Sequence, residues 1–438
     1  MAPDVVPTAT TLRHRLAAHL ADDGWLRSPA WRAAVEAVPR HEFVRCFYRE
    51  TDAPGLTTWA PVTAGLVGVE EWLRQAYSDE TLVTQFDGQE SDWDDPKPVS
   101  GAHPTSSSTL PALVVHMLEE LRVDDGTTVM EIGTGTGYST ALMCHRLGSD
   151  RVTSIETDPA VAARARGALG HCGYTPRLVI GDGLAGAPAG APYDRTIATC
   201  GVRHVPYAWV RQTRPGGLIL ATLRGWMRSL GLVRLTVGRD GRAEGRFIDG
   251  DPSFMIARQQ DGPTSLGVIP AQDDGVSRGT PYGPDVLTSG DSGFMAQLAM
   301  PCARFFSLPA DDGTPRTYVL DGADGSFAVL TPQGNGVWNV RQGGPVALWD
   351  ALEDALDAWH AAGSPAPTEC GVTVTAESQW VWLGAPDGPS LRLPAQVTTS
   401  DGSAQPDGPR RRSPRSGSAP AGPGGGPAGA EVEGGTPH

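Results

Sequence analysis

Cysteines are few in this sequence, and none are paired at a metal-binding spacing. The chain of 438 residues has six. No two of them form a Cys-x-x-Cys pair, so the pattern predicts no metal site. A disulfide framework is not expected either, because such frameworks are typical of short secreted chains. We expect most of the six to be small core residues; they are Cys46, Cys144, Cys172, Cys200, Cys302 and Cys370.

Positive charge and long apolar runs are also scarce. The 35 Lys and Arg residues stand against 50 Asp and Glu, a formal net charge of −15. Nucleic acid is excluded as an expected partner, because phosphate contacts need basic patches. The excess of acid suits either a cationic peptide or solubility alone. No run approaches the roughly 18 apolar residues of a membrane helix, and no basic-then-apolar leader opens the chain, so we expect a cytoplasmic protein without a membrane partner.

Length and composition predict a large domain with a smaller one beside it. Hydrophobic residues make up 39% of the chain and charged residues 19%, which is typical of a globular protein with some disordered sequence. The 55 glycines and 38 prolines concentrate towards the C-terminus. The predicted division is a helical and substrate-loop region at 1–105, a core at 106–258, a connection at 259–293, a small α+β accessory domain at 294–396 and a disordered tail at 397–438.

A glycine-rich turn stands out near the middle of the chain. The apolar run Val129–Ile132 breaks into Gly133, Gly135 and Gly137 and then resumes with helical periodicity. This pattern predicts a buried strand, a tight turn and a helix. The spacing is G-x-G-x-G, unlike the dinucleotide fingerprint, and no P-loop lysine follows. Glu131 just before the turn would repel phosphate, so the stretch favours a cationic or zwitterionic ligand such as S-adenosylmethionine.

Strand and helix patterns alternate from residue 127 to 258, which predicts a parallel, doubly wound, Rossmann-like α/β sheet covered on both faces. Helices are expected at Tyr138–Leu147, Pro159–Leu169 and Val205–Gln212. Leu232–Val237 and Phe254–Ala257 are candidates to extend the sheet, the second as an antiparallel edge. The predicted strands are Val129–Ile132, Val152–Ile155, Leu178–Ile180, Thr196–Thr199 and Leu218–Leu223.

Two acidic residues end strands of this predicted sheet. Glu156 follows the glycine turn by about 20 residues, the spacing at which a carboxylate accepts the ribose hydroxyls of a nucleoside. Asp182, between Gly181 and Gly183, ends the next strand and would accept from an adenine amino group. Taken singly, each has an ordinary alternative, a surface carboxylate or an Asp-Gly turn. Together with the glycine turn they mark one ligand-binding sheet edge.

The segments before the core contain helices and one long polar stretch. Helices are predicted within Thr11–Val38, at Gly65–Tyr77 and from Pro111 onward. Between them, residues 84–109 are polar and glycine-rich, which is typical of a linker, a lid or a binding loop. Thr109 lies near the predicted start of the Pro111 helix, where free amides and hydroxyls would receive a carboxylate.

The accessory region reads as a small α+β unit. Strands are predicted at Tyr318–Leu320, Phe327–Thr331 and Val337–Arg341, then a helix through residues 348–359 and a hairpin over residues 372–383. Four tryptophans gather in its second half, which favours either a substrate-docking surface or ordinary core packing; they are Trp349, Trp359, Trp380 and Trp382.

Several motifs in order resemble those of protein-L-isoaspartate O-methyltransferases. The resemblance rests on the glycine turn, Ile155-Glu156, Gly181-Asp-Gly183, Ala191-Pro-Tyr-Asp194, Arg214-Pro-Gly-Gly217 and two upstream segments at 38–44 and 106–111. It implies a class I methyltransferase core that uses S-adenosylmethionine, with Ser107 and Thr109 at the reacting centre. It also implies the donor-binding set Ser106, Ser108, Glu131, Gly133, Thr134, Gly135, Gly137, Glu156, Asp182, Gly183 and Thr199.

The sequence departs from the family's repair enzymes in three places. Thr109-Leu110-Pro111 replaces Ser-Gln/Ala-Pro, the loop over residues 84–100 is longer and more acidic, and the region after Gly293 has no expected counterpart. These departures are similar to the branch that methylates an aspartate of a precursor peptide, as for lanthipeptides and graspetides, leading to aspartimide and isoaspartate. The alternatives are repair of isoaspartyl residues in damaged proteins and a non-catalytic peptide-binding protein.

Methyl transfer to a carboxylate places modest demands on the residues. An aspartate with a pKa of about 4 is already ionised at neutral pH and needs no general base. The protein must chiefly remove water and align the two reactants, with the carboxylate oxygen roughly 3 Å from the methyl carbon. Hydroxyls suit this better than Lys or Arg, which would stabilise the carboxylate before it reacts. His103 and His204 are candidates for the pocket border or for the surface.

Overall fold

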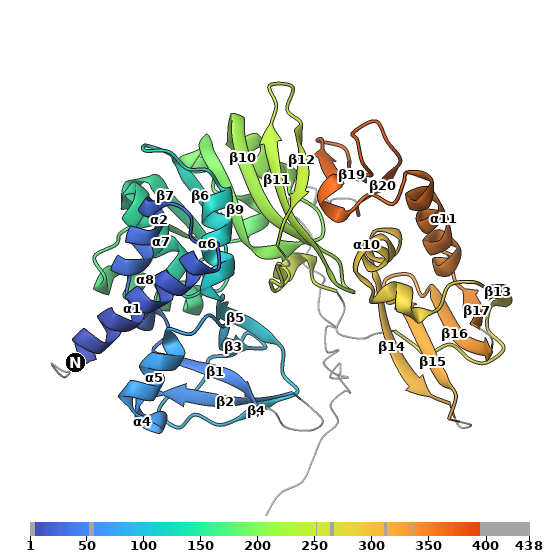
Figure 1. The fold of residues 1–438 in the computed structure, drawn as a ribbon, viewed down its shortest axis with the longest axis horizontal. Coiled ribbons are helices and arrows are strands. Elements are labelled where there is room, and N and C mark those ends of the chain that lie inside the picture. The colour runs from blue at the N-terminus through green and yellow to red at the C-terminus, as the bar shows by residue number, and fades with distance from the viewer. Residues whose placement is uncertain are drawn as a thin grey trace, which may run out of the picture. The chain divides into compact units, whose positions relative to one another are not determined.

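A computed structural model describes residues 5–51, 57–250, 252–262, 267–310, 313–334 and 336–394 (Figure 1). The expected tail at 397–438 lies outside the described residues. In the described part of the chain, no helix has both the length and the apolar character needed to cross a membrane. Nor do the described ranges hold a group of three or more His, Cys, Asp or Glu side chains placed to bind a metal ion.

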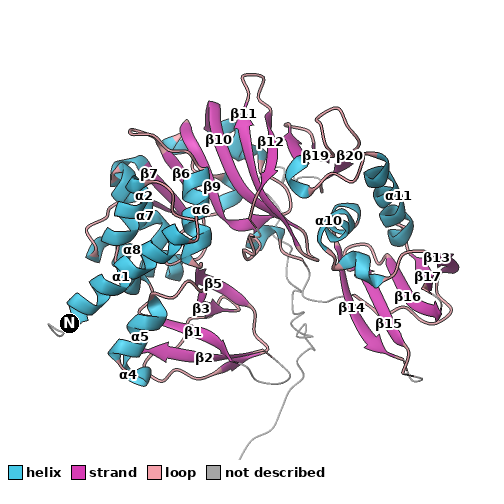
Figure 2. Ribbon diagram, viewed as in Figure 1, coloured by secondary structure: helices cyan, strands magenta, loops and turns pink. Residues whose placement is uncertain are grey.

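The centre of the fold is a ten-stranded sheet whose order is β20-β19-β18-β12-β11-β10-β9-β6-β7-β8 (Figure 2). The strands from β10 to β8 are parallel, and those from β10 outward to β20 are antiparallel. The predicted doubly wound, Rossmann-like sheet is therefore confirmed. Its strands are β6 (Val129–Ile132), β7 (Val152–Glu156), β8 (Arg177–Ile180), β9 (Tyr193–Val202), β10 (Thr213–Arg224), β11 (Ser229–Val237), β12 (Ala243–Ile248), β18 (Gly371–Val374), β19 (Gln379–Trp382) and β20 (Ser390–Arg392).

Helices cover both faces of this sheet, and each face has its own hydrophobic core. Val129 belongs to the core that includes α1, α2, α6 and α7, whereas Met130 and Ile132 belong to the core that includes α9 and that continues to α10 and α11. This division follows from the alternation of side chains along a strand. The helices are α1 (Val5–Asp22), α2 (Pro29–Ala37), α3 (Arg40–Phe43), α4 (Ala64–Val67), α5 (Val69–Ala76), α6 (Pro111–Glu120), α7 (Tyr138–Leu147), α8 (Pro159–His171), α9 (Tyr207–Gln212), α10 (Gly290–Ala299) and α11 (Leu348–Ala361).

The polar stretch at 84–109 contains strand residues at 84–86, 99–100 and 104–108, which corrects the prediction of a loop throughout. It contributes to a five-stranded antiparallel sheet of order β4-β2-β1-β3-β5. Val83 pairs with Ser107, and Leu82 pairs with Ser108. Periodicity did not indicate this sheet because β5 consists of proline, threonine and serines. The strands are β1 (Cys46–Thr51), β2 (Thr58–Thr63), β3 (Leu82–Phe86), β4 (Val99–Ser100) and β5 (Pro104–Ser108).

Two smaller expectations are also corrected. The predicted helix at Gly65–Tyr77 is divided into α4 and α5 at Gly68, whose φ of +83° interrupts the helix. Phe254–Ala257 forms no strand and makes a single bridge, parallel, between Ile256 and Gly201. The antiparallel extension of the core sheet is made instead by β11 and β12.

The C-terminal part of the described chain contributes to two sheets. A second five-stranded antiparallel sheet has the order β13-β17-β16-β15-β14 and packs against α10 and α11. Its strand β13 lies in the segment predicted as a connection, and the predicted hairpin, now β18 and β19, instead joins the core sheet through β12. The strands are β13 (Val276–Thr280), β14 (Ala303–Pro309), β15 (Pro315–Asp321), β16 (Phe327–Gly334) and β17 (Val337–Gly343).

The four C-terminal tryptophans do not form an exposed docking surface. Trp349 and Trp382 are buried at 0% and 2% exposure. The indole of Trp349 donates to Thr280 Oγ1 at 3.1 Å, and that of Trp359 donates to the carbonyl of Pro365 at 2.9 Å. For Trp349 and Trp382 the structure therefore supports core packing, and Trp359 and Trp380 are half-buried.

Candidate active site

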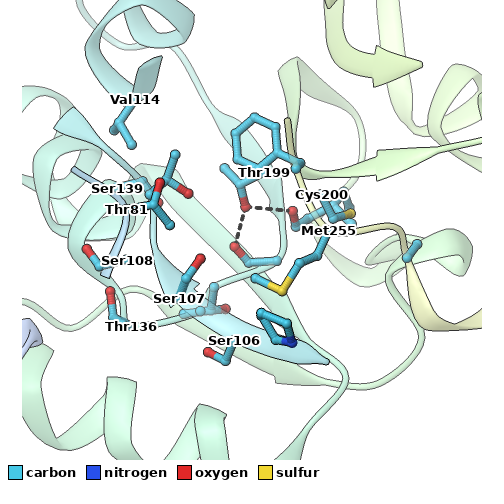
Figure 3. A pocket seen from close by; sticks show the side chains of 18 of the residues that line it. Thr81, Ser106, Ser107, Ser108, Val114, Thr136, Ser139, Thr199, Cys200 and Met255 are labelled. Carbon is cyan, nitrogen blue, oxygen red and sulfur yellow. Dashed lines mark hydrogen bonds between the residues drawn. The ribbon is translucent and has the colours of Figure 1, made fainter. Parts of the chain in front are cut away.

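A cavity of about 750 Å³ lies at the carboxyl edge of the parallel strands. Its wall is made by β5, the glycine turn after β6, the ends of β7 and β9, and residues 253–259. In Figure 3, Ser106, Ser107 and Ser108 lie on one side of the cavity, and Thr199, Cys200 and Met255 lie on the other. The cavity thus contacts both the predicted donor turn and the predicted reacting centre.

The glycine turn presents its backbone to this cavity. Gly133, Thr134 and Gly135 line the cavity, whereas Gly137 is the N-cap of α7 and lies outside the lining. Gly133 has a φ of +94°, and a Cβ there would lie 2.8 Å from Thr199 Oγ1. Thr199 also lines the cavity, and its hydroxyl donates to the carbonyls of Ile132 and Gly133.

Glu156 lies beside the turn, and backbone amides orient both oxygens of its carboxylate. Its two oxygens accept backbone N–H groups, Oε2 from Gly135 at 2.9 Å and Oε1 from Asp158 at 3.1 Å. A carboxylate oxygen has a second lone pair, so each can still accept a hydroxyl. The side chain is 9% exposed and lines the cavity, which is the placement that the ribose prediction requires.

Glu131 does not reach the cavity, which corrects its assignment to the donor site. The side chain is fully buried below the turn. It accepts hydroxyls from Ser139 and Thr140 at 2.5 Å and from Ser154 at 2.6 Å. Burial raises the pKa of Glu131 above its usual value, although the three hydroxyls oppose that change. Its role is to tie the start of α7 to β7, and its charge is not available to a ligand.

Asp182 is placed at the next strand end but outside the lining. It is exposed, and its carboxylate accepts from the amide of Leu184 at 2.9 Å, which caps the short 3-10 turn Gly183–Ala185. Gly183 and Leu184 line the cavity. The backbone after β8, rather than the Asp182 side chain, therefore forms this part of the wall.

The hydroxyls of β5 line the opposite side. Ser106 and Ser108 are 6% and 3% exposed, and Ser107 is half-buried between them. Ser106 accepts from Thr84 Oγ1 at 3.1 Å, whereas Ser108 Oγ is buried with no hydrogen-bond partner. Thr109 lines the cavity directly after the strand. A buried hydroxyl without a partner is costly in a finished protein, so this wall is suited to receive a polar ligand.

The N-terminus of α6 is already occupied by a carboxylate of the chain itself. The amide of Ala112 donates to Asp79 Oδ1 at 2.8 Å, and the amide of Leu110 donates to Thr81 Oγ1 at 3.2 Å. The N-cap is Leu110, which makes no side-chain hydrogen bond, and Thr109 directly precedes it, near the helix start as predicted. The helix end is therefore not free to bind a substrate carboxylate.

Arg40 explains why the upstream motif belongs to this site. It is fully buried and donates to the carbonyls of Ala76, Ser78 and Glu80 and, at 3.3 Å, of Thr109. Burial lowers the pKa of Arg40 to about 10. The guanidinium thus fixes the backbone at Thr109 without lining the cavity.

The two candidate histidines lie elsewhere. His103 is exposed outside the lining, in agreement with the surface alternative. His204 also lies outside the lining, with Nε2 3.1 Å from Gln260 Nε2. It is half-buried rather than exposed at the surface, and burial lowers the pKa of His204 to about 4.

Sequence reasoning missed much of the cavity wall. The residues involved are far from the motifs and carry no local signal; they are Trp25, Trp59, His116, Phe254, Met255 and Arg258. His116 contacts Trp25 edge to face at 5.3 Å and its Nε2 lies 2.7 Å from the carbonyl of Asp249. Glu156 and Arg258 are the only carboxylate and guanidinium among the described residues of the wall.

Comparison with known proteins identifies the family. The family model for protein-L-isoaspartate(D-aspartate) O-methyltransferase matches residues 71–236. The protein-L-isoaspartate O-methyltransferase of Methanopyrus kandleri is 30% identical over 228 residues, which cover 51% of this chain and 82% of the relative. The chain belongs to the protein-L-isoaspartate O-methyltransferase family. Its core sheet is accordingly that of a class I methyltransferase, and the family is one of enzymes.

Other members of the protein-L-isoaspartate O-methyltransferase family match over shorter lengths. The enzyme of Thermococcus onnurineus is 34% identical over 150 residues, 33% of this chain and 66% of the relative. That of Ignicoccus hospitalis is 39% identical over 129 residues, 29% of this chain and 60% of the relative. The chain thus spans a little under two thirds of these relatives. A solved protein-L-isoaspartate O-methyltransferase has a TM-score of 0.48 and 20% identity, covering 85% of this chain and 100% of its own.

Proposed function

We propose that the protein is an S-adenosylmethionine-dependent carboxyl O-methyltransferase that acts on aspartyl groups of a peptide or protein. The observation that carries the proposal is that one cavity contains both the glycine turn with Glu156 and the hydroxyl-bearing strand with Ser107 and Thr109. Family membership supports the reaction class. The donor and the acceptor would therefore meet within a single cavity.

The donor end fits the nucleoside of S-adenosylmethionine. Glu156 would accept the ribose hydroxyls with the lone pairs that its two backbone bonds leave free. The amides and carbonyls of Gly133 and Gly135 would approach the methionine part, since no side chain intervenes. The wall after β8, at Gly183 and Leu184, would contact the adenine.

The acceptor end fits a carboxylate that reacts without a base. In the transfer, a carboxylate oxygen forms a bond to the methyl carbon while the carbon–sulfur bond breaks and its electron pair remains on sulfur. The negative carboxylate and positive sulfonium become a neutral ester and a neutral thioether. Removal of water favours such a loss of charge. Ser107 and Thr109 would orient the carboxylate with hydroxyls, which leave its charge weakly held before reaction.

For the substrate, we propose an ordinary aspartate of a dedicated precursor peptide, which would give aspartimide and then isoaspartate. The acidic segment at 84–100 and the departure at Thr109-Leu110 support this choice. The names of the relatives favour a second candidate, methylation of isoaspartyl residues in damaged proteins. Both substrates present a single carboxylate beside a backbone amide, so the same cavity serves either.

Matched peptides that contain either Asp or isoAsp at one position, incubated with S-adenosylmethionine, test the proposal. Methylation adds one CH2 to the peptide mass, and attack of the backbone amide on the ester then expels methanol, a net loss of one water. Turnover of Asp peptides supports the precursor function, and turnover of isoAsp peptides alone supports repair. Donor binding without transfer to any peptide would contradict both and indicate a binding protein.

Variants of the hydroxyl wall link activity to this cavity. Thr109→Val and Ser107→Ala should each lower kcat/KM by about tenfold or more, because each removes a hydrogen bond to a charged acceptor. Ser100→Ala is the matched control, since its hydroxyl lies 2.9 Å from Thr58 Oγ1 in the same sheet and outside the cavity. Equal activity in all three variants would place the reacting centre elsewhere.

A further inference from the structure

Residues 252–262, here called the strap, cross the carboxyl edge of the core sheet. The strap is joined to the end of β9, because Gly201 donates to the carbonyl of Met255 at 2.8 Å and Ala257 donates to the carbonyl of Gly201 at 2.8 Å. It then reaches Asp158, just after β7. β6 lies between β9 and β7, so the strap joins the two strand ends on either side of the glycine turn, and both the strap and the turn line the cavity.

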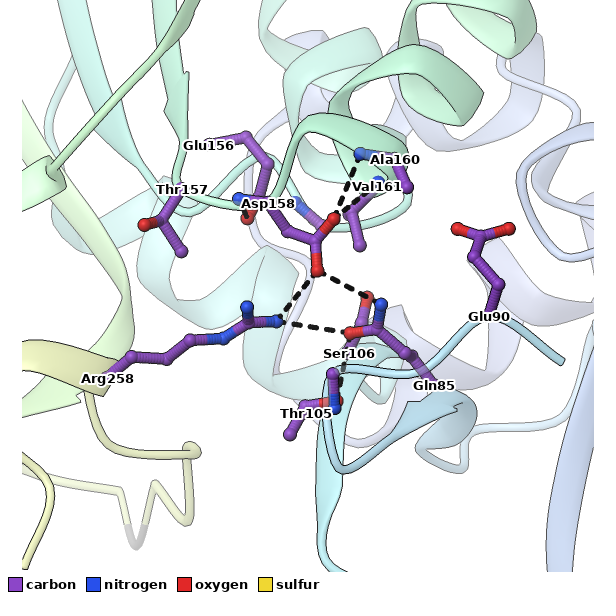
Figure 4. A network of polar contacts seen from close by, with 12 residues as sticks. Gln85, Glu90, Thr105, Ser106, Glu156, Thr157, Asp158, Ala160, Val161 and Arg258 are labelled. Atoms are coloured by element: carbon purple, nitrogen blue, oxygen red, sulfur yellow. Dashed lines mark hydrogen bonds and ion pairs between the residues drawn. The ribbon is translucent and has the colours of Figure 1, made fainter. Parts of the chain in front are cut away.

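Arg258 fastens the strap to two other parts of the protein (Figure 4). Its Nη2 donates to Asp158 Oδ2 and to Gln85 Oε1, both at 3.1 Å. Gln85 Nε2 donates to the same Asp158 oxygen at 3.0 Å, which closes a triangle of three side chains. Asp158 and Gln85 are 7% and 1% exposed, whereas the Arg258 side chain is 40% exposed. The guanidinium thus lies between the cavity and the buried pair of Gln85 and Asp158, and it donates hydrogen bonds to both.

One arm of this triangle leads to the ribose-binding carboxylate. The second oxygen of Asp158 accepts from Ala160 and Val161 and so caps α8. The backbone amide of Asp158 donates to Glu156 Oε1 at 3.1 Å. Burial raises the pKa of Asp158, but the bonds from Gln85, the helix amides and Arg258 outweigh it and hold the pKa below its usual value. Fixing the Asp158 side chain therefore fixes the amide that orients Glu156.

The other arm leads to the acceptor strand. Gln85 Oε1 also accepts from Thr105 Oγ1 at 2.9 Å. Thr105 lies on β5 two residues before Ser107, and Gln85 pairs with Ser106 in the sheet. Gln85 Oε1 therefore accepts one hydrogen bond from the acceptor strand, through Thr105, and one from the strap, through Arg258.

We infer that Arg258 is a positioning residue that holds the ribose-binding carboxylate and the acceptor strand in register through Asp158 and Gln85. This inference rests on the proposed donor site at Glu156. Arg258 acts on the donor through Asp158 and Glu156, so its effect should vanish when Glu156 can no longer bind the ribose. A residue that merely stabilises the fold would have the same effect in either background.

A double-mutant cycle on donor affinity tests the inference, with S-adenosylhomocysteine as the calorimetric probe. Arg258→Met should weaken its binding about tenfold, and Arg258→Lys should recover part of the loss because an ammonium can still reach Asp158. Glu156→Gln should weaken binding by at least as much. In the Glu156→Gln background, Arg258→Met should add less than about a twofold loss.

Arg164→Met is the matched control. Arg164 lies on α8, the helix that Asp158 caps, pairs with Glu90, and has the same 40% side-chain exposure as Arg258. It should leave the affinity unchanged. Thermal unfolding of every variant shows whether it is folded.

The outcomes separate the inference from the proposed function. Wild-type protein that does not bind S-adenosylhomocysteine, or binding that is unaffected by Glu156→Gln, would refute the donor site itself. A donor site that depends on Glu156 but not on Arg258 would overturn the inference alone. So would losses that multiply in the double variant, because they would show that Arg258 acts independently of Glu156.

Discussion

Replacing Gly133 by alanine tests whether the shape of the glycine turn is set by its contact with β9. Gly133 has a φ of +94°, and a side chain in such backbone costs about 1–3 kcal/mol. The new Cβ would also lie 2.8 Å from Thr199 Oγ1, which adds a crowding cost of about 1–3 kcal/mol. Gly126→Ala is the control. Its φ is +84°, but the nearest atom to its Cβ is Arg151 Nη1 at 3.8 Å, so only the first cost applies.

Urea unfolding of the two variants, with and without Thr199→Ala, separates the two costs. Gly133→Ala should lower the free energy of unfolding by about 3 kcal/mol, and Gly126→Ala by about 1 kcal/mol. Removing the Thr199 hydroxyl should recover the crowding cost, a coupling of about 1–3 kcal/mol between positions 133 and 199. Equal losses for Gly133→Ala and Gly126→Ala, or no coupling, would refute the reasoning.

Two further predictions concern stability rather than the cavity. Because burial lowers the pKa of His204 to about 4, the unfolded chain binds a proton below about pH 6.5 that the folded chain does not. Stability should therefore fall by roughly 3 kcal/mol as the pH drops from 6.5 to 4. The urea midpoint of His204→Gln should depend less on pH across this window than that of the wild type. An equal pH dependence in the two proteins would contradict the lowered pKa of His204. Asp79→Ala should cost about 1 kcal/mol by uncapping α6 at Ala112. The KM for a peptide should stay constant, and a raised KM at unchanged stability would instead show that Asp79 binds substrate.

The core sheet could be predicted because its signals are local. The observed β6 and α7 agree residue for residue with Val129–Ile132 and Tyr138–Leu147. Gly133 and Gly137 interrupt the chain at those boundaries, and a short apolar run between breaks has few other structures available. Glu156 followed from its spacing after the turn, and its placement in the cavity wall agrees with that spacing.

The rest of the site depends on contacts between distant segments. The strand Pro104–Ser108 is polar on both faces, so its pairing with Leu82–Phe86 has no hydrophobic alternation to reveal it. Glu131 was expected at the cavity because it precedes the turn. The hydroxyls of Ser139 and Thr140, on the following helix, enclose it instead. Nothing in a local window indicates that Arg258 lies beside β3.

The strands that complete the core sheet are separated from it by more than a hundred residues of chain. β12 ends at Ile248, and its outer neighbour β18 begins only at Gly371. During synthesis, β12 therefore presents an unpaired edge until the whole second sheet has left the ribosome, and such edges promote association between chains. A chain cut after Gly293, where the predicted accessory domain begins, would keep that edge permanently. The C-terminal boundary of the unit that contains the core sheet is thus set by the pairing of β18 with β12, and not by the change in composition near residue 293.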